Sequence, residues 1–167
     1  MTLGWTNSHL HQFKVEDDCY SDMRHHFAEF EDDPEILEAS RFTLQQIAPD
    51  VKDTISYEYD FGDSWEHAIT VEQQLPGAAD SASVALCLDG ARACPPEDCG
   101  GVGGYEDLQK ILKNRRHPEH KRMKEWLGHP FDAEAFDLAK TNFWLRKLKW
   151  PRVTEAQLRK VLISRDS

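Results

Sequence analysis

The first half of the chain alternates apolar and polar residues, and the second half spaces its apolar residues as helices do. The alternation predicts a strand over residues 9–15 and a β-hairpin over residues 53–75. Residues 61–64 have the composition of the hairpin turn, because Gly62 can adopt a positive φ. The hairpin is the clearest element that the sequence predicts.

Helical spacing of apolar residues predicts five helices. They cover residues 41–48, 103–114, 118–128, 133–148 and 154–162. Strands come first and helices follow, an order that favours an α+β fold over an alternating α/β fold. We expect a small, mostly antiparallel sheet that is centred on the hairpin and packed by the C-terminal helices.

The chain, residues 1–167, is expected to form a single domain, in keeping with its length. Residues 16–38 carry ten acidic side chains in 23 positions and are expected to form an acidic, mobile excursion. The chain opens on the apolar segment Leu3-Gly4-Trp5, and the predicted sheet is small enough to leave a bare edge. We therefore expect that upstream N-terminal strands are missing from this sequence.

Charge is divided unevenly along the chain. Residues 1–109 carry 5 Lys and Arg against 23 Asp and Glu, a net charge of −18, whereas residues 110–167 carry 15 against 7, a net charge of +8. The favoured interpretation is that the two parts attract each other, within the fold or in a homodimer. The alternative is that the basic part binds nucleic acid, although the acidic part would repel it. The candidate phosphate-contacting residues are Arg115, Arg116, Lys121, Arg122 and Lys124.

The composition, with 40% apolar and 30% charged residues, is ordinary for a globular protein. No stretch approaches the roughly 18 uninterrupted apolar residues of a membrane span, and the N-terminus does not resemble a signal peptide. Four cysteines, as free thiols or metal ligands, fit a reducing compartment. We expect a cytoplasmic location and no membrane partner.

Two segments, residues 57–67 and 95–105, hold most of the polar residues that could carry chemistry. Asp60 and Asp63 flank the hairpin turn, where aspartate usually accepts hydrogen bonds from the amides of the turn itself. Residues 97–98 are acidic and precede four glycines that lead into a helix, without the lysine of a phosphate-binding P-loop. The alternative to such structural roles is a shared ligand pocket. Its candidate residues are Asp60, Asp63, Trp65, His67, Glu97, Asp98 and Tyr105.

Histidine and cysteine residues offer a candidate metal site. His9 and His11 share one face of the first strand, an arrangement that metal sites use. His67 lies on an apolar strand face, where a hydrogen-bonded core histidine is the more common case. The cysteines of residues 87–99 have spacings unlike those of zinc ribbons, which favours buried free thiols. The candidate ligands are His9, His11, His67, Cys87, Cys94 and Cys99, and the candidate cofactor is a divalent metal such as Zn²⁺.

Three ordered blocks of the sequence, Gly4–Phe13, Tyr59–His67 and Ala93–Tyr105, have recognisable motifs. They resemble the family that is named after the third open reading frame of a root-inducing plasmid, and the resemblance extends to Phe143. It implies an α+β fold, a gene carried on a bacterial plasmid, transposon or chromosome, and an uncharacterised activity without accepted catalytic residues. Family members normally begin with a further strand pair, which agrees with missing upstream residues.

Some members of that family bear the label of a transposon resolvase, or TnpR-like passenger. A serine recombinase needs a nucleophilic serine that several arginines support. Only Arg24, Arg41 and Arg92 precede residue 115, and no such serine stands out. We therefore discount a resolvase activity.

Three functions are compatible with these patterns. The first is a non-enzymatic accessory protein that binds a ligand or a protein partner in the candidate pocket. The second is a metal-dependent enzyme, for instance a hydrolase, in which a metal-bound water supplies the nucleophile that the chain otherwise lacks. The third is nucleic-acid binding through the basic C-terminal helices. The sequence leaves open whether the protein is an enzyme.

Overall fold

A computed structural model describes residues 3–22, 36–74 and 86–148. The chain divides into two compact units, which we call the helical unit and the sheet unit. The helical unit comprises residues 1–8, 62–65 and 84–148, and the sheet unit comprises residues 9–61, 66–83 and 149–167. The hairpin turn and Trp65 are therefore grouped with the helices. The single domain expected from the sequence stays a prediction.

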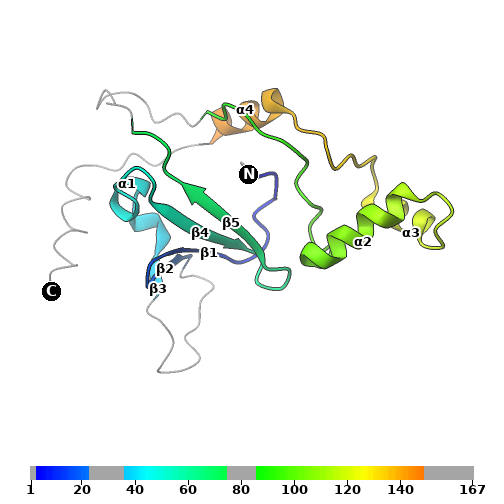
Figure 1. The fold of residues 1–167 in the computed structure, drawn as a ribbon, viewed down its shortest axis with the longest axis horizontal. Helices are drawn as coiled ribbons and strands as arrows, with labels where there is room; N and C mark the ends of the chain where they lie inside the picture. Colours follow the sequence, from blue (N-terminus) through cyan, green and yellow to red (C-terminus); the bar gives the residue numbers. More distant parts are fainter. Residues whose placement is uncertain (1–2, 23–35, 75–85, 149–167) are drawn as a thin grey trace, which may run out of the picture. The chain divides into compact units, whose positions relative to one another are not determined.

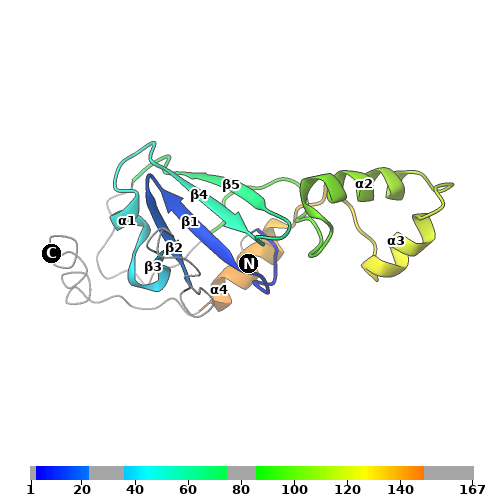
Figure 2. The ribbon, with the colours of Figure 1, turned by 90° about the horizontal axis from the view of Figure 1, so that it is seen from below.

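Within the described residues, the sheet has five strands in the order β3-β2-β1-β4-β5 (Figures 1 and 2). β1 (His11–Val15) pairs antiparallel with both β2 (Asp18–Ser21) and β4 (Thr54–Tyr59). β3 (Ile36–Glu38) runs parallel to β2, and β5 (Trp65–Thr70) lies next to β4. The hairpin and the α+β class are confirmed. The predicted first strand is confirmed over residues 11–15, whereas His9 and Leu10 precede it.

Strands β2 and β3 lie at the two ends of the segment that we expected to be an acidic, mobile excursion. Their apolar residues explain the difference, because Tyr20 is only 2% exposed and its ring packs 4.9 Å from that of Phe42. The acidic composition of the segment obscured these two short strands. Residues 23–35, between them, lie outside the described residues.

Short helical turns follow β3 in the sheet unit. They are the 3₁₀ helix η2 (Ala39–Arg41) and α1 (Leu44–Ile47), which confirm the helical turns predicted around residues 41–48. The backbone amide of Thr43 donates to Oε1 of Gln46 over 2.8 Å and so fixes the start of α1. The buried core of this unit includes Tyr20, Ile55 and Tyr59.

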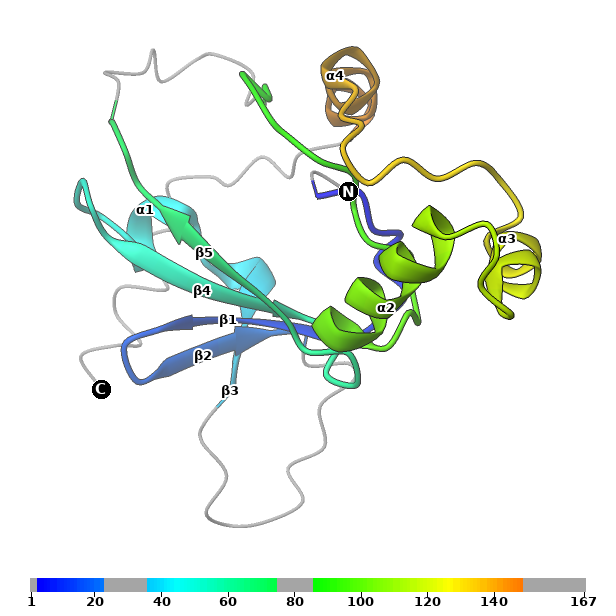
Figure 3. The same ribbon diagram turned by 45° about the vertical axis from the view of Figure 1, so that its right-hand side comes forward.

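The helical unit contains α2 (Gly101–Lys113), α3 (His120–Leu127) and α4 (Leu138–Lys147) (Figure 3). The first two match the predicted helices closely. α4 begins five residues later than the expected position 133, because the Asp137 carboxylate accepts the Lys140 amide over 2.8 Å and caps the helix there. The predicted helix over residues 154–162 lies outside the described residues.

None of the helices in the described ranges is long and apolar enough to cross a membrane.

Candidate functional site

The glycine-rich start of α2 packs directly against the hairpin turn, within the helical unit. Oδ2 of Asp63 accepts the amide of Gly100 over 3.1 Å. Gly100 and Gly101 have φ values of +89° and +64°, which favour glycine. A Cβ on Gly101 would lie 2.4 Å from the backbone oxygen of Asp63. These glycines therefore allow a close approach between the turn and the helix.

Gly104 serves a second close approach, one turn further along α2. A Cβ at this position would lie 2.0 Å from the backbone oxygen of Cys99, whereas a Cβ on Gly103 would meet nothing within 4 Å. Two of the glycines thus satisfy steric needs of the fold itself. This geometry accounts for Gly101 and Gly104 without a bound phosphate.

Glu97 has a structural role in the same unit. Its Oε1 accepts both the amide of Thr6, over 2.9 Å, and the Thr6 hydroxyl, over 2.8 Å. Two of the predicted pocket carboxylates, those of Asp63 and Glu97, thus accept hydrogen bonds from backbone amides. Both groups are therefore poor candidates for a general acid or base.

Two further pocket candidates belong to a row of aromatic rings. The ring centroid of Trp65 lies 5.7 Å from that of Trp5 and 6.1 Å from that of Tyr105. Tyr105 in turn lies 6.2 Å from Phe131. Trp65 is 8% exposed, so this row forms part of the core of the helical unit.

The thiols near α2 are held in their neutral form. Burial, followed by the negative charge of Glu97, raises the pKa of Cys94 to about 12. Burial, followed by the charge of Asp63, raises the pKa of Cys99 to about 11. Thiols with such pKa values are weak nucleophiles near neutral pH. Cys87 donates its thiol proton to the backbone oxygen of Asp89 over 3.2 Å.

A cavity of about 250 Å³ lies between α2 and α3. Its wall contains the buried Leu108 and the 48%-exposed Trp126. Asp98 and Asp107 bring carboxylates to its lining, and Arg122 brings a guanidinium. The remaining lining residues are Cys99, Gly104, Ile111 and Met123. The cavity thus offers apolar contact together with both signs of charge.

The sequence does not reveal this cavity, although three of its lining residues stand in three different candidate sets: Asp98 as a pocket residue, Cys99 as a metal ligand and Arg122 as a phosphate contact. The available signal was the apolar stripe of two consecutive helices that a short connection joins. Such a pair is expected to pack side by side and can enclose a groove.

The basic residues proposed to contact nucleic acid lie on α3 and on the connection before it. Arg115, Arg116 and Lys124 are exposed. Lys121 pairs with Glu125 over 3.7 Å, and Arg122 pairs with Glu119. These exposed pairs reduce the positive charge that the helix presents to a phosphate.

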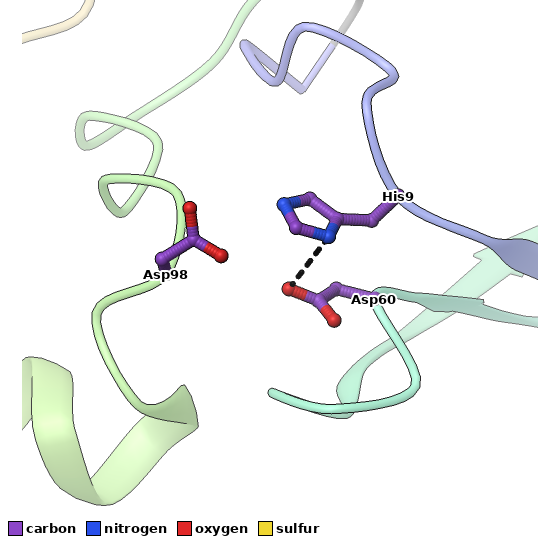
Figure 4. A group of neighbouring side chains, drawn as sticks. All are labelled: His9, Asp60 and Asp98. Atoms are coloured by element: carbon purple, nitrogen blue, oxygen red, sulfur yellow. Dashed lines mark ion pairs between the residues drawn. The ribbon is translucent and has the colours of Figure 1, made fainter.

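In the sheet unit, His9 and Asp60 form a pair at the end of β4. Nδ1 of His9 lies 3.5 Å from Oδ2 of Asp60 (Figure 4). Asp60 is 8% exposed and has a φ of +59°, and its amide donates to the backbone oxygen of Leu10 over 2.8 Å. The ring of His9 also meets that of Tyr59 edge-on at 5.9 Å.

The other two candidate metal ligands among the histidines, His11 and His67, flank Tyr57 on one face of the sheet. The ring centroid of Tyr57 lies 6.0 Å from that of His11, 5.6 Å from that of His67 and 4.7 Å from that of Phe13. Nδ1 of His67 lies 3.3 Å from the backbone oxygen of Tyr57. Burial, followed by the charge of Tyr59, raises the pKa of Tyr57 to about 12, so its hydroxyl stays protonated.

Neither proposed set of three metal ligands converges within the described parts of its unit. The ligand atoms of the three histidines do not all lie within 4.8 Å of one another, and those of the three cysteines do not either. Of the pocket candidates, Asp60 and His67 belong to the sheet unit and the other five to the helical unit. The pocket as a whole and the metal sets stay predictions.

Comparisons with known proteins agree with one another. The family model described as plasmid pRiA4b ORF-3-like protein matches residues 1–140. The uncharacterized protein y4hQ of Sinorhizobium fredii (strain NBRC 101917 / NGR234) is 33% identical over 154 residues, which cover 90% of this chain and 76% of y4hQ. The crystal structure of MM3350 from Methanosarcina mazei Go1, a protein of unknown function, has a TM-score of 0.61 and 31% identity, covering 83% of this chain and 76% of that one.

Proposed function

We propose a function from the geometry, because the chain belongs to the plasmid pRiA4b ORF-3-like family and both proteins compared above are of unknown function. In this proposal, the protein is a ligand-binding accessory protein that uses the cavity between α2 and α3. The carrying observation is that this cavity combines apolar walls with charged groups of both signs. Pockets that bind small molecules have this composition.

The size and lining of the cavity indicate the class of ligand. A volume of about 250 Å³ lies just below the roughly 300–1,000 Å³ of typical small-molecule sites, so it suits a group of amino-acid size. Leu108 and Met123 offer apolar contact, whereas Arg122 can pair with a carboxylate of the ligand in exchange for its partner Glu119. Asp98 can pair with an ammonium group. A free amino acid with an apolar side chain, or such a residue at a peptide terminus, meets all three demands.

Titration of isotopically labelled protein with a panel of free amino acids tests this proposal. We expect leucine, phenylalanine or a related compound to shift the amide signals of α2 and α3. Met123→Trp, which fills the cavity, should abolish the shifts, and Arg116→Ala on the exposed connection should leave them unchanged. A concentration of about 10 mM exceeds a Kd of about 1 mM tenfold and would nearly saturate such a site. If no apolar amino acid shifts those signals at this concentration, the proposal is wrong.

The His9–Asp60 pair favours a metal-dependent enzyme as the second candidate function. Metal-bound histidines often pair with a carboxylate, and such a pair can also supply two ligands itself. Elemental analysis of untagged protein decides this alternative. We expect bound Zn²⁺, Mn²⁺ or Fe²⁺ near one ion per chain if it holds, and a His9→Ala variant should lose the ion. A single metal site should hold about one ion per chain. A content of less than about 0.1 ion per chain after soaking with each metal would therefore exclude the metal-dependent enzyme.

Exposed Arg115, Arg116 and Lys124 keep nucleic-acid binding as a third candidate. If it holds, affinity for duplex DNA should fall steeply as the salt concentration rises, since each phosphate contact releases a counterion. Replacement of all three residues by alanine should remove binding and reduce that slope. An absence of binding at low salt would dismiss this function.

The cysteines and the family description bear on the cellular location and the genetic context of the protein. We propose a cytoplasmic location, because its four cysteines are free thiols, as is usual in a reducing compartment. Its family description links it to plasmids. An accessory role on mobile elements, including transposons, fits that link.

A further inference from the structure

A second cavity within the helical unit has a volume of about 590 Å³. That volume lies inside the roughly 300–1,000 Å³ of typical small-molecule sites. Three aromatic side chains line the cavity, those of Phe131, Phe136 and Trp144. None of its lining residues lines the cavity between α2 and α3, so the two cavities are separate.

Two of the aromatic rings are held in place by packing. The ring centroid of Phe131 lies 6.2 Å from that of Tyr105, at one end of the aromatic row described above. The ring of Phe136 packs so closely against Gly90 that a Cβ added to this glycine would lie 2.3 Å from it. Much of the aromatic wall is therefore formed without a ligand, as is usual in small-molecule pockets.

The third ring belongs to the face of α4 that lines the cavity. Lys140 and Trp144 are four residues apart and so project from the same face of the helix. Trp144 is 51% exposed, and its ring meets that of Phe143 edge-on at 5.4 Å. The open part of the indole offers a surface on which a flat aromatic ring can stack.

The two carboxylates of the lining are already matched by main-chain donors. Oδ1 of Asp132 accepts the amide of Glu134 over 3.0 Å. Oδ1 of Asp137 accepts the amide of Lys140 over 2.8 Å, which is the contact that caps α4. Hydrogen bonds from amides to an ionised carboxylate are strong ones. Neither carboxylate therefore needs a cation from a ligand.

The lysine and the arginine of the lining are less well matched. Among the described residues, the ammonium group of Lys140 has no ion-pair partner. Nε of Arg92 lies 3.6 Å from Oε2 of Glu134, but the two side chains are 77% and 76% exposed, and exposed pairs of this kind contribute little. Both cations can therefore donate hydrogen bonds to an anionic group of a ligand.

The parts of the helical unit that lie outside the described residues supply no anion for these cations. They are residues 1–2 and 84–85, which contain no acidic side chain. Residues 149–167 carry 5 Lys and Arg against 2 Asp and Glu, a net charge of +3, so Lys140 and Arg92 would repel them. A ligand from outside the chain is the better match, and the acidic residues 23–35 are the competitor that an experiment must exclude.

We propose that this cavity is a ligand site for a flat aromatic molecule that carries one carboxylate. The aromatic part of the ligand lies against the three aromatic side chains, and its carboxylate accepts hydrogen bonds from Lys140 and Arg92. Binding here does not depend on the amino-acid site proposed between α2 and α3, because the two cavities share no lining residue.

2-Naphthoate is the direct probe, titrated into the isotopically labelled full chain. The readout is the indole N–H signal of Trp144, which Trp144→Phe identifies by its loss. We expect a shift with a Kd near or below about 1 mM. 2-Naphthamide, which lacks the charge, and cyclohexanecarboxylate, which lacks the flat ring, should each bind about tenfold more weakly. If 2-naphthylmethylammonium binds as tightly as 2-naphthoate, or if about 10 mM 2-naphthoate leaves the signal unshifted, the proposal is wrong.

Substitutions of the two cations add a test on the side of the protein. Lys140→Gln keeps the backbone amide that bonds Asp137 and should weaken 2-naphthoate binding about tenfold. Arg92→Asn should weaken it about threefold, and asparagine tolerates the φ of +69° at this position, so the fold should be retained. Lys113→Gln, at the end of α2 and outside the lining, makes the same change of charge and should leave the affinity within about twofold. An unchanged affinity in both cavity variants would overturn the proposal.

A further variant distinguishes a ligand from the chain itself. Replacement of the acidic residues Glu29, Glu31, Asp32, Asp33 and Glu35 by the corresponding amides should leave the affinity for 2-naphthoate within about twofold. A gain in affinity of about tenfold would show that this acidic stretch competes for the cavity, and the proposal would then be wrong.

Discussion

Replacement of Gly101 by alanine should destabilise the protein strongly, because two independent costs meet at this residue. Gly101 begins α2 with a φ of +64°, a conformation that costs a residue with a side chain about 1–2 kcal/mol. The added Cβ would also lie 2.4 Å from the backbone oxygen of Asp63. Relief of that overlap requires a backbone shift, and such overpacking costs roughly 1–3 kcal/mol.

The two costs sum to about 2–5 kcal/mol, and the lower entropy of the unfolded alanine variant returns less than about 1 kcal/mol of this. We therefore expect the free energy of unfolding to fall by about 1–4 kcal/mol, a large part of the 5–15 kcal/mol that is typical of a domain. Gly103→Ala is the matched control. It lies two residues further along α2, and its Cβ would meet nothing within 4 Å. It should stabilise the helix by roughly 0.5–1 kcal/mol.

Urea unfolding followed by circular dichroism and by tryptophan fluorescence measures both variants. Agreement of the two signals shows whether one transition describes the whole chain. Hydrogen exchange of the Leu108 amide, in the middle of α2, adds a local measurement. A Gly101→Ala variant within about 0.5 kcal/mol of the wild type, a difference typical of neutral surface changes, would refute the close packing of the turn against α2.

Three further predictions concern other contacts of the helical unit. Asp63→Ala should lower the free energy of unfolding by about 1 kcal/mol, because the Gly100 amide loses its acceptor, and Asp63→Asn should retain most of it; equal losses in urea melts would contradict this. Asn142→Ala should cost about 1–3 kcal/mol and speed exchange of the Cys87 amide, since the Asn142 side chain bonds both the amide and the oxygen of Cys87 over 2.9 Å; unchanged exchange would count against it. The pKa of Cys94, about 12, exceeds the roughly 8.5 of an unfolded thiol, so its contribution to stability is complete below pH 8.5 and is lost as the pH rises toward 12. Cys94→Ala should therefore flatten the alkaline decline of stability in urea melts, and an unchanged slope would exclude this cause.

Much of the fold could be predicted from local pattern. The alternation of apolar residues located the hairpin, and Pro118 and Gly128 marked the limits of the region that forms α3. Local pattern failed where a tertiary contact outweighed composition. β2 lies in an acidic stretch, yet Tyr20 is buried by its contact with Phe42. The start of α4 depends on the cap that Asp137 provides. The residues from 133 onward continue the apolar spacing of the helix, so the pattern alone placed its start too early.

The candidate site could be predicted less well, because a residue type does not reveal its partners. Asp63 and Glu97 had the composition of a ligand pocket, but their carboxylates hold Gly100 and Thr6. The partner of Glu97 lies 91 residues away in the sequence, a separation that no spacing rule covers. Likewise, the volume and lining of the cavity depend on how α2 and α3 pack, so the apolar stripes of the two helices could indicate a groove between them but not which residues line it.

The assignment of the hairpin turn to the helical unit has a practical consequence for dissecting this protein. No single cut of the chain separates the two units, because each is built from three stretches of sequence. A fragment of residues 84–148 expressed alone would lack Asp63, Trp65 and Thr6, so the start of α2, one aromatic row and Glu97 would lose their contacts. Function should therefore be assigned by point substitutions in the full chain. A substitution in one unit leaves all three stretches of the other unit in place.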